Sequence, residues 1–379
     1  MSVATRPIPA AAPAAAPYRV MVVDDSAVIR GLVGRWLGAD PAVQLVASCP
    51  NGKVAVTEVA RMRPEVVVLD IEMPEMDGLT ALPKLIAAVP GLKVIMASTL
   101  TLRNADISLR ALSAGAADYI PKPSSTAEMT GADIYKRELV EKVKALGAAF
   151  RLQTGGRGDG PSPAAPRKAT SLYAGGPIVL RKLLPQRRQV LAIGSSTGGP
   201  QALFALFREL KGKLEVPVLI TQHMPKTFTT ILAEHLRRIV GGNCEEAKDG
   251  MALKPGHLYV APGDFHMTVA QQGAERLIKL NQDPPENFCR PAVDPMFRSL
   301  SKAYGHGVLA VVLTGMGQDG LKGARAVAEG GGALLAQDEA TSVVWGMPGA
   351  VATAGLCNAV LPVDRVGGAI LKVLQGAAP

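Results

Sequence analysis

Residues 190–200 read VLAIGSSTGGP and combine a short apolar strand, a glycine-rich turn and the start of a helix. Apolar residues at helical spacing follow, which indicates an amphipathic helix packed on a sheet: Leu203, Phe204, Leu206, Phe207 and Leu210. This order places serine hydroxyls beside backbone N–H groups and the positive end of a helix dipole. Such a turn suits a nucleophilic serine, and it equally suits a loop that holds phosphate. The turn alone leaves both alternatives open.

Continuous apolar strands alternate with amphipathic helices on both sides of this turn. We expect such strands at 19–23, 66–69, 94–97, 119–120, 190–193, 216–221, 308–314 and 333–337. Strands without polar alternation are typical of parallel sheets covered by helices on both faces. The segment 257–280, interrupted by Gly273, predicts antiparallel strands inserted into the second series.

The chain of 379 residues is long enough for two domains, and its 48% apolar content supports two cores. We therefore predict an α/β protein. A disordered leader (1–17) precedes a doubly wound, five-stranded parallel domain (18–145). A flexible basic linker rich in glycine and proline (146–188) then leads to a doubly wound, mostly parallel domain with an antiparallel insertion (189–376).

The net charge of +9 is concentrated in the linker region. Residues 151–190 hold eight basic residues and one acid, Asp159, so they carry seven of the nine net positive charges. The two domains are therefore close to neutral, and aromatic residues make up only 4% of the chain. This balance tells against a nucleic-acid partner.

Cysteine usage and hydropathy point to the cytoplasm. The four cysteines are scattered and form no CxxC pair, which favours free thiols in a reducing compartment. No apolar run approaches the roughly 18 residues of a membrane span, and the start of the chain lacks a signal-peptide pattern. We expect no membrane insertion.

Polar residues gather at the ends of the N-terminal strands. Asp24 and Asp25 follow the first strand, Asp70 and Ser98 end later ones, and Lys122 follows the last. Ligands of parallel sheets bind at the carboxyl ends of the strands, and three carboxylates brought together there would repel one another. A Mg²⁺ ion relieves that repulsion, and the backbone carbonyl of Glu72 adds a candidate ligand. Lys122 would offset further charge, and Ser98 could donate to a phosphoryl oxygen.

These residues resemble the response-regulator receiver domain over about 18–145, through VVDDSAVIR, VVVLDIEMPEMDGL, VIMAS and ADYIPKP. The resemblance implies that a partner histidine kinase phosphorylates Asp70 and that Asp24 and Asp25 bind Mg²⁺. It also implies roles for Ser98 as the switch hydroxyl, Tyr119 as the switch aromatic residue and Lys122 as the conserved lysine.

A serine nucleophile needs a base and a group that orients the base. Of five histidines, only His223 ends an apolar strand, VPVLITQ. Asp319 lies in the glycine loop after the strand 308–313, where it could instead cap the next helix. Ser196, His223 and Asp319 thus lie at three strand ends and form a candidate triad. The backbone N–H groups of Thr197, Gly198 and Gly199 are candidate oxyanion donors.

Residues 194–198 fit G-x-S-x-G, but the chain order Ser, His, Asp differs from the order Ser, acid, His of α/β-hydrolases. The segments AIGSSTGGP, ITQHMP, YVAPGDFHM, RPAVDPMF, LTGMGQDG and VVWGMPGAV resemble the catalytic domain of chemotaxis protein-glutamate methylesterases. This resemblance implies hydrolysis of glutamyl methyl esters, and deamidation of glutamines, on the cytoplasmic helices of chemoreceptors. The esterase would need no cofactor. Ser195 stands where alanine is common in that family, so it is a second candidate nucleophile.

We expect the receiver domain to inhibit the esterase by covering the Ser196 edge, and phosphorylation of Asp70 to loosen this packing. Three other functions are weighed against the esterase. A phosphate-binding output domain would leave His223 and Asp319 without roles, and the chain has no Walker lysine. A DNA-binding regulator lacks a helix-turn-helix signal. A non-catalytic chemosensory scaffold would be unaffected by loss of Ser196.

Overall fold

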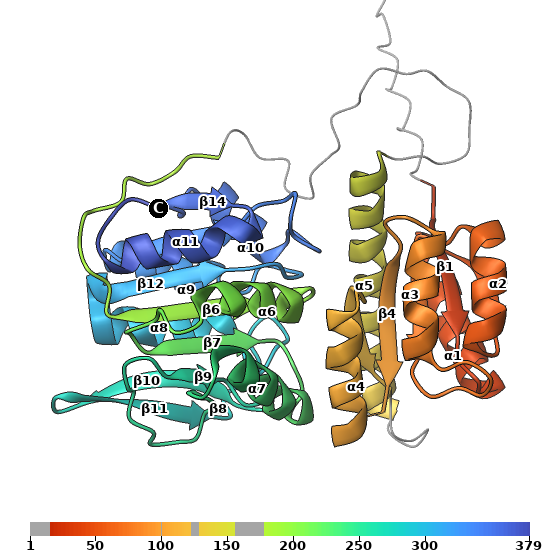
Figure 1. The fold of residues 1–379 in the computed structure, drawn as a ribbon, viewed down its shortest axis with the longest axis horizontal. Coiled ribbons are helices and arrows are strands. Elements are labelled where there is room, and N and C mark those ends of the chain that lie inside the picture. The colour runs from red at the N-terminus through yellow and green to blue at the C-terminus, as the bar shows by residue number, and fades with distance from the viewer. Residues whose placement is uncertain (1–15, 100, 123–128, 156–177) are drawn as a thin grey trace, which may run out of the picture.

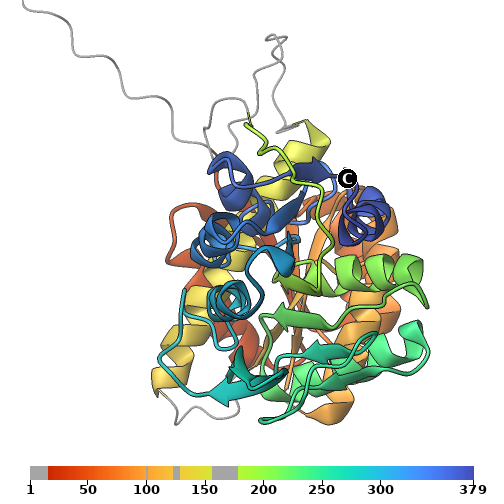
Figure 2. The same cartoon turned by 90° about the vertical axis from the view of Figure 1, so that its left-hand side faces the viewer.

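The computed structural model describes residues 16–99, 101–122, 129–155 and 178–379. Two α/β domains lie side by side in Figure 1, and in Figure 2 the second domain lies in front of the first. Within the described residues, the first domain has a five-stranded sheet, and the second has a seven-stranded sheet with a separate antiparallel pair. This architecture confirms the fold class expected from the apolar strand pattern.

The N-terminal domain has the strand order β2-β1-β3-β4-β5, with parallel pairing throughout. Its strands are β1 (Tyr18–Val23), β2 (Val43–Cys49), β3 (Val66–Asp70), β4 (Lys93–Ser98) and β5 (Asp118–Pro121). Its helices are α1 (Ala27–Gly38), α2 (Gly52–Met62), α3 (Gly78–Ala88), α4 (Leu102–Ser113) and α5 (Met129–Thr154). Polar side chains cap four of these helices by accepting a backbone N–H of the first turn: Ser26, Asn51, Asp77 and Thr101.

The C-terminal sheet has the order β14-β13-β12-β6-β7-β9-β8, again with parallel pairing. Its strands are β6 (Val190–Ser195), β7 (Val218–Gln222), β8 (Cys244–Glu246), β9 (Leu258–Val260), β12 (Val308–Val312), β13 (Ala333–Gln337) and β14 (Ala359–Leu361). The helices are α6 (Gly199–Leu210), α7 (Lys226–Val240), α8 (Val293–Tyr304), α9 (Leu321–Glu329), α10 (Met347–Thr353) and α11 (Val363–Leu374), with a 3₁₀ turn at Gly305–Gly307. Every residue of the inner strand β12 is 0% exposed, because helices cover both faces of the sheet.

The segment 257–280 was predicted as antiparallel, and this is correct only for its second part. β10 (His266–Gln272) pairs antiparallel with β11 (Glu275–Asn281) across a turn at Gly273, where φ is 60°. β9, however, pairs parallel with both β7 and β8. Its three residues are all buried, so they belong to the main sheet rather than to the hairpin.

The ends of the predicted linker need correction. Helix α5 continues to Thr154, so residues 146–154 are helical, because residues such as Leu146 are buried against the first sheet. Residues 178–188 run without helix or strand along the second domain, where Arg188 is 3% exposed and its guanidinium donates to the carbonyl oxygens of His306 and Gly331. The centre of the linker (156–177) and the leader up to residue 15 lie outside the described residues.

The carboxyl edge of the second sheet faces the first domain, with α4 beside α6 and α7 (Figure 1). Tyr119 of β5 stacks on Phe228 of α7, with ring centroids 4.2 Å apart. His235 of α7 lies 2.9 Å from Asp106 of α4. The edge that carries the candidate nucleophile is therefore the edge that the N-terminal domain approaches.

Among the described helices, none is both long and apolar enough to cross a bilayer.

Candidate active site and phosphorylation site

The two adjacent serines have different surroundings. Ser195 is the last residue of β6; it is 0% exposed, and its Oγ donates a 2.7 Å hydrogen bond to Oε1 of Gln222. Ser196 begins the turn and is partly exposed. Among the described residues, its hydroxyl has no hydrogen bond to His223. The accessible hydroxyl of the pair is therefore that of Ser196.

The turn after β6 has no room for larger residues. Gly198 has φ of 77°, and a Cβ atom on Gly199 would lie 2.0 Å from Oε1 of Gln222. The N–H of Gly199 donates to the carbonyl of Ser196 at 2.8 Å, so this donor is already engaged. Of the three candidate oxyanion donors, Thr197 and Gly198 fit this turn better than Gly199.

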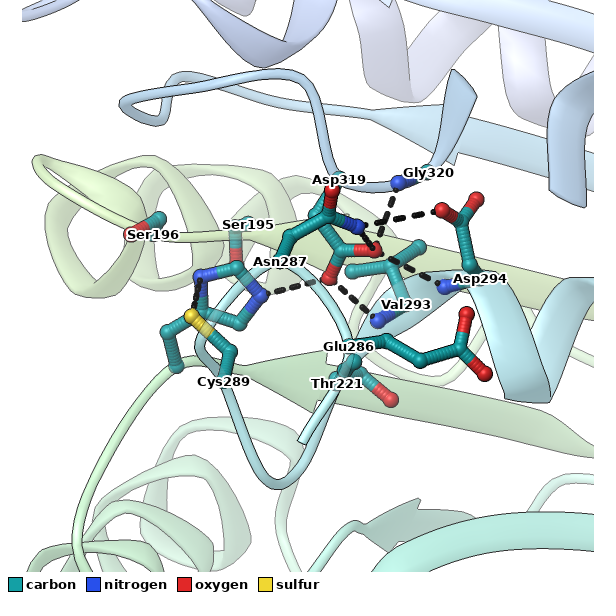
Figure 3. Close-up of polar contacts among 12 residues, drawn as sticks. Ser195, Ser196, Thr221, Glu286, Asn287, Cys289, Val293, Asp294, Asp319 and Gly320 are labelled. Carbon is teal, nitrogen blue, oxygen red and sulfur yellow. Dashed lines mark hydrogen bonds and ion pairs between the residues drawn. The ribbon is translucent and has the colours of Figure 1, made fainter. Parts of the chain in front are cut away.

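His223 follows directly after β7, as the apolar strand predicted. Its backbone N–H donates to the carbonyl of Ser195 at 3.1 Å, which fixes it beside the end of β6. Its side chain is 11% exposed, and its Nε2 lies 2.7 Å from Oδ2 of Asp319 (Figure 3). Its Nδ1 lies 3.3 Å from Sγ of Cys289. Both ring nitrogens therefore have a partner in this structure.

Asp319 is 1% exposed and accepts four further hydrogen bonds. Its donors are the backbone N–H groups of Val293 (2.6 Å), Asp294 (3.1 Å) and Gly320 (2.9 Å), and the side-chain amide of Asn287 (3.0 Å). The first two are the opening N–H groups of α8, so the carboxylate sits at the positive end of that helix. The alternative that Asp319 caps α9 is wrong, because the N-cap of that helix is Gly320 and makes no side-chain bond.

These contacts set the charges of the pair. Burial raises the pKa of Asp319, but the hydrogen bond and charge of His223 and the backbone donors outweigh it, so the net pKa lies below its usual value. Burial lowers the pKa of His223, yet Cys289 and Asp319 raise it well above its usual range. The arrangement stabilises an imidazolium beside a carboxylate, which a general base needs after it has taken a proton.

The strand ends of the N-terminal domain also converge. Asp24, Asp25 and Asp70 each offer a carboxylate oxygen within 4.8 Å of the others. Lys122 Nζ lies 2.6 Å from Asp24 Oδ2 and 2.7 Å from Asp70 Oδ1. Burial, opposed by Lys122 and assisted by Asp24, raises the pKa of Asp70 to about 6. Three hard oxygen donors in one cluster fit Mg²⁺, whereas Glu72 is exposed and its role as a ligand stays a prediction.

The two predicted switch residues are both buried but have different neighbours. Ser98 is 1% exposed, and its Oγ accepts a 3.2 Å hydrogen bond from Ser108 of α4. Tyr119 is 4% exposed and lies between the domains, against Phe228. Burial, with the charge of Asp118, raises its pKa well above the usual value, so the ring stays neutral. Tyr119 is thus part of the contact between the N-terminal domain and α7, and its role as a switch stays a prediction.

Comparison with known proteins finds a matching family for each of the two domains. The family model of the response regulator receiver domain matches residues 20–132, and that of the CheB methylesterase matches residues 191–370. A protein-glutamate methylesterase/protein-glutamine glutaminase from Azospirillum brasilense is 58% identical, over 98% of each chain. The chain belongs to this methylesterase family. A second relative with that name, of the group 2 operon of Rhodospirillum centenum, is 58% identical over 94% of each chain.

A solved structure is also similar to the methylesterase domain. The Thermotoga maritima CheB methylesterase catalytic domain is 38% identical, with a TM-score of 0.48, and the match covers 50% of this chain and 100% of that one.

The sequence alone did not indicate four residues that lie at this site. Gln222 joins the ends of β6 and β7, since its amide donates to the carbonyl of Ser196 at 2.9 Å and accepts from Ser195. Asn287 and Cys289 come from the segment between β11 and α8, and Asp294 is the second residue of α8. The string RPAVDPMF marked the second half of this segment, but nothing in it showed contact with His223 or Asp319.

Proposed function

We propose that the protein is a phosphorylation-activated hydrolase. It removes methyl groups from glutamyl methyl esters, and deamidates glutamines, on the cytoplasmic helices of chemoreceptors. The observation that carries the proposal is the 2.7 Å contact between Nε2 of His223 and Oδ2 of Asp319, beside the partly exposed Ser196. The family membership supports the reaction, and the names of the relatives supply the two substrate classes.

The reaction begins when Oγ of Ser196 attacks the ester carbonyl. Because Nε2 of His223 faces Asp319, the proton of Ser196 goes to Nδ1. Asp319 stabilises the imidazolium, and the N–H groups of Thr197 and Gly198 are the proposed donors to the oxyanion. The intermediate collapses to a glutamyl-enzyme as the imidazolium gives its proton to the departing methanol. A water molecule, deprotonated by His223, then releases glutamate and restores Ser196.

Deamidation follows the same course on a glutamine side chain. The leaving group is ammonia in place of methanol, and the product is again glutamate. The same serine, base and oxyanion donors therefore serve both substrates, and this half of the protein needs no cofactor in the proposed mechanism.

The receiver domain controls access to this site. A histidine kinase donates a phosphoryl group to Asp70, and Mg²⁺ bound by Asp24, Asp25 and Asp70 would neutralise charge on the phosphoryl oxygens. Lys122 holds the carboxylates together before phosphorylation. The unphosphorylated receiver covers the Ser196 edge through contacts such as Tyr119 on Phe228, and phosphorylation loosens them. The reaction takes place in the cytoplasm, with no nucleic acid and no membrane insertion.

Methanol release from methylated receptor membranes tests this function. The full chain is compared with and without a phosphodonor and Mg²⁺, beside Ser196→Ala and Ser195→Ala. Release that requires Ser196 and rises on phosphorylation is the expected result. Release that survives Ser196→Ala would place the nucleophile elsewhere, and absence of release from every preparation would contradict the esterase.

A further inference from the structure

The four residues Glu286–Cys289 form a tight turn in front of α8. Backbone hydrogen bonds join Glu286 and Cys289 in both directions, at 3.1 and 2.9 Å. Between them, Asn287 and Phe288 have φ of 51° and 64°, the left-handed region that side chains such as phenylalanine rarely adopt. A strained turn of this kind persists only where its surroundings hold it in place.

The turn contacts both the base and its orienting acid. The amide of Asn287 donates to Oδ1 of Asp319 at 3.0 Å and to Oδ2 of Asp294 at 3.2 Å. Two residues later, Sγ of Cys289 lies 3.3 Å from Nδ1 of His223. In the view of Figure 3, Cys289 and Ser196 lie on one side of the site and Asp319 on the other. A shift of this one turn therefore changes the surroundings of His223 and Asp319 together.

The mechanism requires Nδ1 of His223 to contact Ser196, but in this structure Nδ1 contacts Cys289. Since Nε2 is held by Asp319, only Nδ1 can accept the proton of Ser196. Cys289 now lies against that nitrogen, whereas Ser196 makes no hydrogen bond to the ring among the described residues. The thiol must leave Nδ1 before the base can activate the serine.

The same turn reaches the receiver domain. The ring of Phe288 is 82% exposed, yet the guanidinium carbon of Arg137 lies 3.8 Å from its centroid. Arg137 belongs to α5 of the receiver, so a cation–π contact links this helix to the turn. The receiver thus contacts the element that carries Cys289 as well as the Ser196 edge.

We propose that Cys289 is a positioning residue whose thiol contacts Nδ1 of His223 in the resting enzyme. Arg137 holds the turn Glu286–Cys289 in place through its contact with Phe288. This inference rests on the proposed function, and it adds a second mode of inhibition: besides covering the site, the resting receiver keeps the base engaged. Movement of α5 away from Phe288 frees the turn, and Cys289 then gives up Nδ1 to Ser196.

Within the described part of the chain, few charged groups face the imidazole of His223. Asp319 and Cys289 contact it directly, and Asp294 lies behind Asp319 across the amide of Asn287. Glu286 is paired with Arg298 of α8 at the other end of the turn. Removal of the thiol therefore changes the group at Nδ1 without removing a partner of Asp319.

Cys289→Ala, Cys289→Ser and Cys244→Ala in the full chain test the proposal. We expect Cys289→Ala to raise the rate of methanol release by the unphosphorylated enzyme about three- to tenfold, which corresponds to the loss of one hydrogen bond. The rate of the phosphorylated enzyme should rise less than twofold. Cys289→Ser keeps a donor at Nδ1 and should restore inhibition. Cys244, a buried thiol of β8, is the control for cysteine loss. An unchanged or lower resting rate in Cys289→Ala would overturn the proposal.

Arg137→Gln tests the link to the receiver. It should raise the resting rate to a similar degree, and its combination with Cys289→Ala should add little, because both changes act on one contact. Full additivity of the two would show that Arg137 does not act through Cys289 and would overturn the link.

A measurement independent of catalysis separates this inference from the proposed function. Nitrogen-15 NMR of the His223 ring in the unphosphorylated protein should show a shifted Nδ1 signal in Cys289→Ala, because the group that contacts this nitrogen is lost. An unmoved Nδ1 signal would refute the thiol contact even if the enzyme is an active esterase. A moved signal would support the contact even if no methanol is released.

Discussion

Thr197 donates a 2.7 Å hydrogen bond from its Oγ1 to Oδ2 of Asp118, although the two residues belong to different domains. Thr197 follows the candidate nucleophile, and Asp118 precedes Tyr119, the predicted switch aromatic residue. Both partners are buried, and Lys142 lies 2.9 Å from the same carboxylate. The receiver therefore contacts the Ser196 turn through a charged, desolvated hydrogen bond, which is stronger than a neutral one.

Thr197→Val should activate the resting enzyme. Loss of a hydrogen bond to a buried carboxylate weakens the interface by about 1.5–3 kcal/mol, so we expect at least a severalfold higher unphosphorylated rate. The rate with phosphodonor should change little, because the contact is then already loosened. Methanol release measures both rates, with Thr197→Ser as the control that keeps the hydroxyl. Equal resting rates in Thr197→Val and the unmodified protein would show that the contact does not inhibit.

The two serines should respond differently to substitution. Ser196→Ala should reduce methanol release to background, because no other partly exposed hydroxyl follows β6 in this turn. Ser195→Ala removes a buried hydrogen bond to Gln222, so about 1 kcal/mol of stability should be lost while turnover is largely retained. Steady-state rates and thermal unfolding measure the two effects. The reverse pattern would make Ser195 the nucleophile.

The stability of the receiver domain should fall as pH rises from about 4 to about 6 in the absence of Mg²⁺. The folded pKa of Asp70 is about 6, above its usual 3.8, so the folded state holds a proton that the unfolded state has already released. A shift of this size corresponds to about 2–3 kcal/mol as an upper bound. Asp70→Asn should remove this pH dependence. Chemical unfolding followed by the fluorescence of Trp36 in α1 measures it.

Mg²⁺ should restore the stability that Asp70 loses at neutral pH. A cation that binds only the folded carboxylate cluster stabilises it by mass action, and Asp70→Asn should weaken this effect. Unfolding midpoints at pH 7 with increasing Mg²⁺ give the comparison. Identical responses of the two proteins would mean that Mg²⁺ does not bind at Asp70.

The acid limb of the esterase pH profile should lie above pH 6.5. The pKa of His223 is raised, so the imidazolium, which cannot accept the proton of Ser196, persists to higher pH than for a free histidine. Activity should therefore fall as pH decreases through this raised pKa. The pH dependence of kcat/KM in the unphosphorylated enzyme tests this, with His257→Gln, which lies against Tyr259, as a control. A limb at or below pH 6.5 would contradict the effect of Asp319 and Cys289.

The sequence by itself determined the two sheets and the residues at their edges. Long apolar strands force helices onto both faces, and the carboxyl ends of parallel strands meet at one edge. Asp24, Asp70, His223 and Ser196 could therefore be assigned to those edges from local patterns alone. Their positions depend on nearby residues, which a single sequence displays.

Only the tertiary structure decided what surrounds these residues. Asp319 caps α8, which begins 26 residues before it, and Cys289 reaches His223 from 66 positions along the chain. The path of the loop before α8 and the left-handed turn at Asn287 and Phe288 set these contacts. Neither leaves a periodic signal in the sequence, because each is fixed by packing against distant elements rather than by local propensity.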